Sequence, residues 1–184
     1  MASYAFHAAA TLLMFVVLPV WIAAGLIDYF CHRASRIAET SGARESLLHL
    51  LQFFLIGLPV VLTLFLSVNA GLFSLMALCI LLHHAVAYVD VRYANSTRKV
   101  TPLEQMIHSF LEVIPITAFL LLAVLHWPQL QALFGIGGEP ARWVPELRPL
   151  SKAYVVSILG SAFVFNLVPY MEELWRCLRF DRRV

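Results

Sequence analysis

Acidic residues and histidines recur four positions apart in this chain. The pairs are Asp28/His32, Glu45/His49 and Glu104/His108. Side chains four residues apart on an α-helix lie on one face, about one turn from each other, so each pair can aim a carboxylate and an imidazole at a common point. Both groups are metal ligands, and the repeated spacing therefore predicts metal binding.

Further candidate ligands lie between residues 83 and 112. His83 and Asp90 are seven residues apart and share a helix face, whereas His84 points about 100° away from His83. We expect one of the two histidines to be a ligand, and the sequence does not indicate which. Glu112 lies in an apolar stretch, where an ionisable group is costly unless it pairs or binds an ion. The predicted metal ligands are Asp28, His32, Glu45, His49, His83, His84, Asp90, Glu104, His108 and Glu112.

Several of these residues also have a simpler interpretation. A single acid/histidine pair on an exposed helix is commonly a charge pair worth roughly 0.2–0.5 kcal/mol. The segment from Thr101 to Glu104 has the form of a capping box, in which the glutamate bonds the start of its own helix. Glu112 could be the buried partner of an arginine or a histidine. The prediction of metal therefore depends on the recurrence of the pattern along the chain.

The composition places these residues in a membrane protein. Of the 184 residues, 61% are hydrophobic, and the mean hydropathy is +0.81, which is too apolar for a water-soluble domain. Each uncharged run is long enough to cross about 30 Å of hydrocarbon. We expect one all-α transmembrane domain over residues 1–184, four of its helices forming a bundle of two hairpins around a polar metal-binding layer and a fifth packed outside. The predicted helices are about 8–32, 44–67, 70–92, 102–126 and 151–176.

The basic residues indicate an orientation. In a five-helix arrangement, ten of the 13 lysines and arginines fall on one side: Arg33, Arg36, Arg44, Arg92, Arg98, Lys99, Arg176, Arg179, Arg182 and Arg183. The positive-inside rule then places the N-terminus outside and the C-terminus in the cytoplasm. The candidate ligands fall in one layer at the cytoplasmic side, and we expect a location in a bacterial inner membrane.

The chain also contains a weak internal repeat. The Glu45/His49 and Glu104/His108 pairs are separated by 59 residues, and Arg33 and Arg92 share this offset. A duplication of two hairpins would relate them by an axis along the membrane normal. Two related ligand sets suggest two metal ions. The repeat is imperfect, because Asp28 has no acidic counterpart at the same offset.

The ligand types narrow the choice of metal. Imidazole and carboxylate together suit iron, zinc or manganese, and the three cysteines have no metal-binding spacing. Carboxylates and histidines projecting inward from four helices are also the construction of di-iron bundles, although the spacing there is three residues. We therefore expect two metal ions and favour iron.

The layout around residues 26–112 resembles the integral-membrane di-iron hydroxylase and desaturase superfamily, which includes fatty acid hydroxylases. The matching residues are His32, His49, His83, His84 and His108. The family has histidine clusters where this chain has Asp28, Glu45 or Glu104 beside a histidine. The resemblance implies a di-metal site at the cytoplasmic membrane surface. The favoured function is a di-iron oxidoreductase acting on a lipid-like or apolar substrate from the bilayer. Its electrons would come from a separate donor.

Other functions are open on the same residues. A di-zinc hydrolase would use the metals to activate water. A non-enzymatic metal-binding or transport protein would need only the ligands, and the acids could conduct ions or protons. Axial haem ligation would leave the neighbouring acids without a role. No nucleic-acid motif is present, which excludes nucleic acid as an expected partner.

Overall fold

The computed structural model describes residues 2–137 and 150–182. Arg183, one of the ten basic residues counted above, and Arg142 and Arg148, two of the other three, lie outside the described residues. Five helices are long and apolar enough to cross a membrane: Phe6–Ala34, Gly42–Phe65, Ala70–Thr97, Pro102–Leu125 and Lys152–Asp181. The five helices predicted from hydropathy are thus present, and the structure is that of an integral membrane protein. Large apolar side chains such as Phe54, Leu81 and Val124 are exposed on their outer faces, as expected for contact with lipid.

The first and last long helices are each built from three segments. α1 (Ala2–Leu12), η1 (Leu13–Val17) and α2 (Leu18–Ala34) form the first, and α7 (Lys152–Ala162), η3 (Phe163–Leu167) and α8 (Val168–Asp181) form the last. η1 and η3 are π-helical turns just before Pro19 and Pro169. Because proline has no N–H to donate, the helix widens there: the Leu18 N–H bonds the Leu13 carbonyl, and the Val168 N–H bonds the Phe163 carbonyl.

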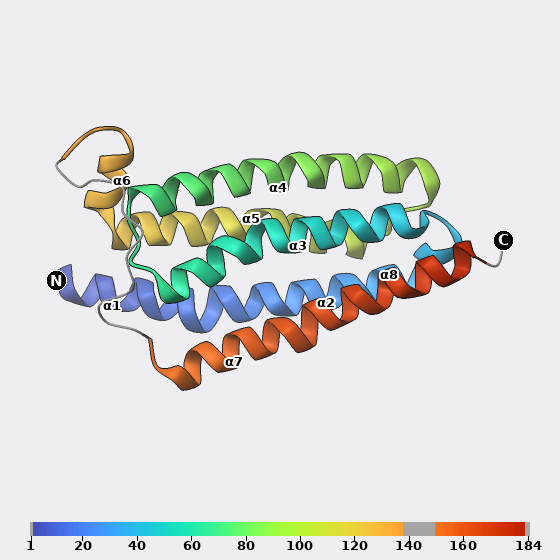
Figure 1. The fold of residues 1–184 in the computed structure, drawn as a ribbon, viewed down its shortest axis with the longest axis horizontal. Helices are drawn as coiled ribbons and strands as arrows, with labels where there is room; N and C mark the ends of the chain where they lie inside the picture. Colours follow the sequence, from blue (N-terminus) through green and yellow to red (C-terminus); the bar gives the residue numbers. More distant parts are fainter. Residues whose placement is uncertain (1, 138–149, 183–184) are drawn as a thin grey trace.

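The remaining elements connect these helices. The 3₁₀ turn η2 (Ile37–Glu39) leads into α3 (Gly42–Phe65), and a short turn leads to α4 (Ala70–Thr97), which Asn69 caps through the Leu72 N–H. α5 (Pro102–Leu125) follows, and then the short α6 (Trp127–Leu133). The loop at 35–41, the loop at 98–101 and the C-terminal end of α8 lie at one end of the molecule, and α6 lies at the other (Figure 1).

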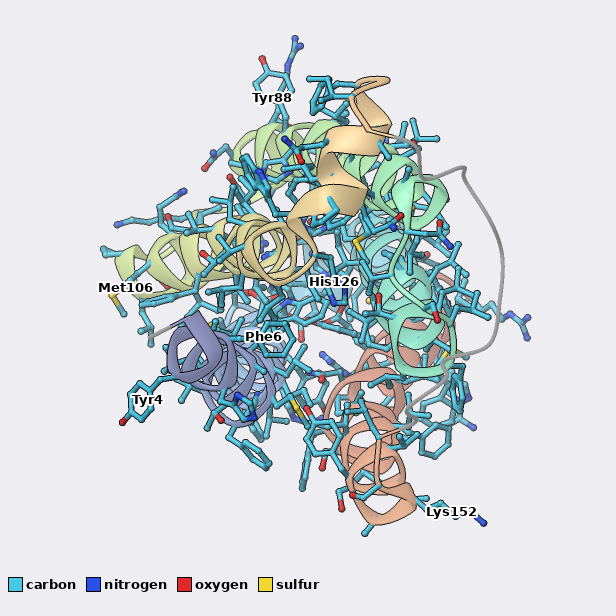
Figure 2. All side chains as sticks on the ribbon, turned by 90° about the vertical axis from the view of Figure 1, so that its left-hand side faces the viewer. Tyr4, Phe6, Tyr88, Met106, His126 and Lys152 are labelled. Atoms are coloured by element: carbon cyan, nitrogen blue, oxygen red, sulfur yellow. The ribbon has the colours of Figure 1, made fainter. Side chains whose placement is uncertain are left out.

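The five long helices form a ring. α2 packs against α5, α5 against α4, α4 against α3 and α3 against α8, while η3 and α8 return to α2. Viewed along the bundle from the α6 end, Tyr88 and Met106 point outward, whereas Phe6 and His126 lie near the middle (Figure 2). This arrangement corrects the expectation of a fifth helix packed outside a four-helix bundle. The reason is α8, which places the fully buried Glu173 between α2 and α3.

A close helix crossing at Gly25 holds α8 in the ring. The Asn166 side-chain amide donates to the Ile22 carbonyl (3.0 Å), and the Tyr170 hydroxyl donates to the Gly25 carbonyl (3.3 Å). A methyl group on Gly25 would collide with the Asn166 amide, whereas nothing lies within 4 Å of one on Gly57. The crossing therefore requires a residue without a side chain at position 25.

Gly25→Ala is expected to destabilise the protein by about 1–3 kcal/mol, because the Asn166 side chain must move from its hydrogen bond. Gly57→Ala, the matched control, should not destabilise the protein and should stabilise it by up to about 1 kcal/mol, because alanine favours a helix and finds open space there. Unfolding in mixed detergent micelles measures both. Equal stability of the two variants would contradict the importance of this crossing.

Candidate metal centre

Seven of the ten predicted ligands meet inside the ring, near the end that carries the loops at 35–41 and 98–101. They come from α2, α3, α4 and α5 and are all buried: Asp28, His32, Glu45, His49, Asp90, Glu104 and His108. We call this set the acid–histidine cluster. The four-residue spacing does place its pairs on common faces, with Asp28 Oδ1 3.4 Å from His32 Nε2 and Glu45 Oε1 3.8 Å from His49 Nε2.

Contacts between helices complete the cluster. Asp28 Oδ1 lies 3.1 Å from His108 Nε2, across the α2–α5 contact, and Asp90 Oδ2 lies 3.3 Å from His49 Nε2, across the α4–α3 contact. Two groups each offer three ligand atoms within 4.8 Å of one another: Asp28, His32 and His108, and His32, Glu45 and His49. Either group could hold a metal ion, and His32 belongs to both.

Several atoms that face one another in the cluster make no hydrogen bond to any described residue. They include Asp28 Oδ1, His32 Nε2 and His49 Nε2. Buried polar atoms are nearly always paired, because an unpaired one costs about 1–3 kcal/mol. Close approach without hydrogen-bonding geometry is the arrangement expected of ligand atoms that aim at a shared cation.

Glu173, on α8, contacts both central histidines from the other side. Its Oε2 lies 3.1 Å from His32 Nδ1, and its Oε1 lies 2.8 Å from His49 Nδ1. The two imidazoles are stacked, with centroids 4.1 Å apart and planes 8° from parallel. A carboxylate at Nδ1 makes that nitrogen the proton donor and leaves the lone pair on Nε2, which faces the cluster. Both histidines are thereby prepared to act as ligands through Nε2.

Arg98, from the loop before α5, joins the two glutamates of the cluster. Its guanidinium donates hydrogen bonds to both carboxylate oxygens of Glu45 and of Glu104, and only 3% of its side chain is exposed. Burial lowers the pKa of Arg98, but the hydrogen bonds to Glu104 and Glu45 outweigh burial and raise the pKa above its ordinary value. Glu45 Oε2 and Glu104 Oε1 each accept only one hydrogen bond and keep a second lone pair, so this arginine positions the glutamates without excluding them as ligands.

The capping box predicted for Glu104 is confirmed. Thr101 Oγ1 accepts from the Glu104 N–H (3.2 Å), and Glu104 Oε2 accepts from the Thr101 N–H (3.4 Å). The same carboxylate also bonds Arg98, and its Oε1 lies 3.6 Å from His32 Nε2. Glu104 therefore combines the capping role with a place in the cluster.

The contacts between helices reveal the internal repeat more clearly than the sequence does. Asp28–His108 and Asp90–His49 are equivalent contacts, in which an aspartate of one hairpin meets the histidine of the other. Asp28 and Asp90 are 62 residues apart, whereas the histidines are 59 apart. The loop at 35–41 is three residues longer than the loop at 98–101, and this difference accounts for the change of offset. At the offset of 62, His32 corresponds to Ala94, and Arg98 corresponds to Arg36, which is exposed and pairs with Glu39, so the two halves are not identical.

The other three predicted ligands lie outside these groups. His84 is half-buried, and its Nδ1 pairs with the Ile80 carbonyl of its own helix (2.8 Å). His83 is buried, with both ring nitrogens unpaired among the described residues, and Glu112 is half-buried. His83 and Glu112 line a cavity that adjoins the cluster.

This inner cavity has a volume of about 630 Å³. Asp28, His49, Asp90 and His108 form its polar end, and the rest of its wall is largely apolar and comes from all five long helices. Its wall includes Phe54, Leu58 and Phe163, which are also exposed on the outer surface of the ring. An apolar molecule could therefore pass from the bilayer into the cavity between α3 and the α7–η3 segment.

Comparison of the chain with protein-family models, curated proteins and solved structures found no match. The functional interpretation therefore depends on the geometry of the cluster and its cavity.

Proposed function

We propose that this protein binds two metal ions in the acid–histidine cluster and uses them on an apolar substrate held in the inner cavity. The main support for the proposal is the negative charge of the cluster. Among the described residues, the cluster and Glu173 contribute five buried carboxylates, against one buried guanidinium, that of Arg98, which pairs with Glu45 and Glu104. Four negative charges are left in an apolar surrounding, which is costly unless they are compensated. Two divalent cations would compensate all four.

The repeat suggests how the ligands divide. Asp28, Glu104 and His108 form one set, and Asp90, Glu45 and His49 form the other. His32 contacts Asp28 and Glu104 through Nε2, so it belongs with the first set. A neutral imidazole has one free lone pair, and Glu173 uses the other nitrogen of His32, so His32 can serve only one ion.

Iron is the metal that we favour, and oxidation of a lipid-like substrate is the reaction class. The ligands are carboxylates and imidazoles without a thiolate, a set that suits iron, zinc or manganese. A pair of iron ions would supply redox chemistry with dioxygen, with electrons from a separate donor. The chain holds the substrate among apolar walls beside the cluster and excludes water from the carboxylates. The membrane orientation that we propose, with the cluster at the cytoplasmic side, follows from the basic residues.

A second cavity argues against ion transport as the alternative function. It has a volume of about 450 Å³, lies toward the α6 end and shares Trp21 and Val60 with the inner cavity. Its wall is largely apolar, with Thr63, His126 and Tyr154 as scattered polar groups. An ion crossing the bilayer would need a continuous polar path, so the two cavities are better suited to an apolar chain. A di-zinc hydrolase would use the same ligands, and the identity of the bound metal separates it from an oxidase.

Metal analysis of the protein purified without a metal-affinity tag tests the proposal. We expect about two iron ions per chain in the natural protein. His49→Ala and His108→Ala should each reduce the metal content to about one ion, because each removes a ligand of one set, and the double variant should hold none. His84→Ala is the matched control and should keep two, because His84 bonds only its own helix.

Other results would change or reject the proposal. Two zinc ions would support the hydrolase instead of the oxidoreductase. A natural protein without metal would show that protonated histidines rather than metals balance the carboxylates. A double variant that keeps both ions would show that His49 and His108 are not the ligands.

A further inference from the structure

The inner cavity contains polar side chains beyond the acid–histidine cluster. They include Gln52, His83, Glu112, Asn166 and Tyr170. Gln52 donates to Asp90 Oδ2 (3.1 Å), and Asn166 donates to the Ile22 carbonyl, so both already have partners. His83 differs from them because it is only 4% exposed and neither ring nitrogen makes a hydrogen bond with the described residues.

An unpaired imidazole at this depth needs an explanation. Leaving a polar group buried without a partner costs about 1–3 kcal/mol, and a leucine would fill the same wall without that cost. The backbone carbonyls of Gln52 and Leu111, on α3 and α5, approach the ring, but neither is placed for a hydrogen bond of good geometry. His83 precedes Asp90 by seven residues on α4, so it lies about 10 Å along the helix from the cluster. His83 is therefore a polar point of the cavity that lies well away from the cluster.

We propose that His83 binds the hydroxyl group of a long-chain alcohol and so determines how the substrate lies in the cavity. A neutral imidazole offers one donor and one acceptor on opposite sides of the ring, and a hydroxyl can pair with either one. This inference rests on the proposed function in taking the inner cavity as the substrate site. It adds a direction: the hydroxyl lies about two helical turns from the cluster, so the carbon that faces the cluster is remote from the hydroxyl-bearing end.

Fluorescence of Trp21, which lines the same cavity, can report binding. A bromine atom quenches a nearby indole, so 12-bromododecan-1-ol and 1-bromododecane are suitable probes for the purified protein in nanodiscs. Trp127 and Trp175 are more than half exposed and would be quenched from the lipid. The binding signal is therefore the difference in quenching between a protein with Trp21 and the same protein carrying Trp21→Phe. This difference is measured for the natural protein and for each His83 or His84 variant.

The alcohol should quench Trp21 at lower concentration than the bromoalkane does. His83→Leu should weaken alcohol binding about tenfold, the loss of one hydrogen bond, and leave bromoalkane binding unchanged. His83→Gln keeps a donor and an acceptor and should bind the alcohol nearly as well as the natural protein. His84→Leu, the neighbouring control, should have no effect. Because His83→Leu removes an unpaired buried polar group, its thermal stability should not fall.

Equal binding of the alcohol to the natural protein and to His83→Leu would overturn the proposal. Loss of metal from His83→Leu would also overturn it, because His83 would then be a metal ligand. Metal analysis of the same samples separates the two hypotheses. A natural protein that lacks metal but binds the alcohol through His83 would reject the proposed function and leave this inference standing.

Discussion

Replacing Glu173 by glutamine is expected to lower the affinity of the cluster for metal by about 10–100-fold, the range found when an outer partner of a ligating histidine is removed. Glu173 accepts from Nδ1 of both His32 and His49. A glutamine side chain has one acceptor oxygen and one donor NH₂ group, so it can accept from only one of them. The other histidine must place its proton on Nε2, where the lone pair for the metal is needed.

Glu172 provides the matched control for Glu173. It is the preceding residue on the same helix, but it lies at the surface, where its carboxylate accepts from Tyr29 (2.7 Å) and pairs with Arg33 and Arg176. Glu172→Gln should change metal affinity less than about twofold, because exposed ion pairs contribute little. Retention of metal against increasing concentrations of a chelator measures both variants. Equal retention would contradict the role assigned to Glu173.

The signal for Glu173 in the sequence is its position on a helix face. Asn166, Tyr170, Glu173 and Cys177 are spaced by four, three and four residues and are all buried, so they form one inward stripe of the last helix. Glu172 lies outside this stripe. The sequence does not show what the stripe faces, because His49 and His32 are 124 and 141 residues away in the chain.

The local and the long-range parts of the site differ in how far they can be predicted. Four-residue spacing fixes which side chains share a face, so the pairs within α2 and α3 are predictable from helix geometry. Packing between helices decides that Asp28 meets His108 and Asp90 meets His49. A shared offset of 59 residues cannot predict these contacts, because the two loops differ in length. His84 shows the limit of spacing alone, since its position beside His83 turns it toward its own backbone.

Arg98 shows a similar limit, because basic residues next to a membrane helix are expected as an orientation signal. In the structure its guanidinium lies between two fully buried glutamates. Arg98→Met should therefore destabilise the protein by about 3–5 kcal/mol, since it leaves both carboxylates without their counter-charge. Arg92→Met is the control; Arg92 is exposed, and its replacement should cost less than about 0.5 kcal/mol. Unfolding in mixed micelles compares the two variants.

Two further variants separate charge from packing at Arg98. Adding Glu45→Gln and Glu104→Gln to Arg98→Met should restore part of the stability, because the uncompensated charges are removed with their partner. Arg98→Lys should be more stable than Arg98→Met but less stable than the natural protein. An ammonium group keeps the positive charge but cannot form the paired hydrogen bonds of a guanidinium with two carboxylates. If the triple variant is as unstable as Arg98→Met, the effect comes from lost packing instead.

Bound metal should reduce the cost of losing Arg98. Divalent ions at the cluster would compensate the same two carboxylates, so Arg98→Met should be less destabilised with metal than after treatment with a chelator. The natural protein should show a smaller difference, because Arg98 already neutralises part of the charge of Glu45 and Glu104. If chelation destabilises both proteins equally, Arg98 and the metal ions do not share these glutamates, and Glu45 and Glu104 are then structural partners of the arginine and not metal ligands.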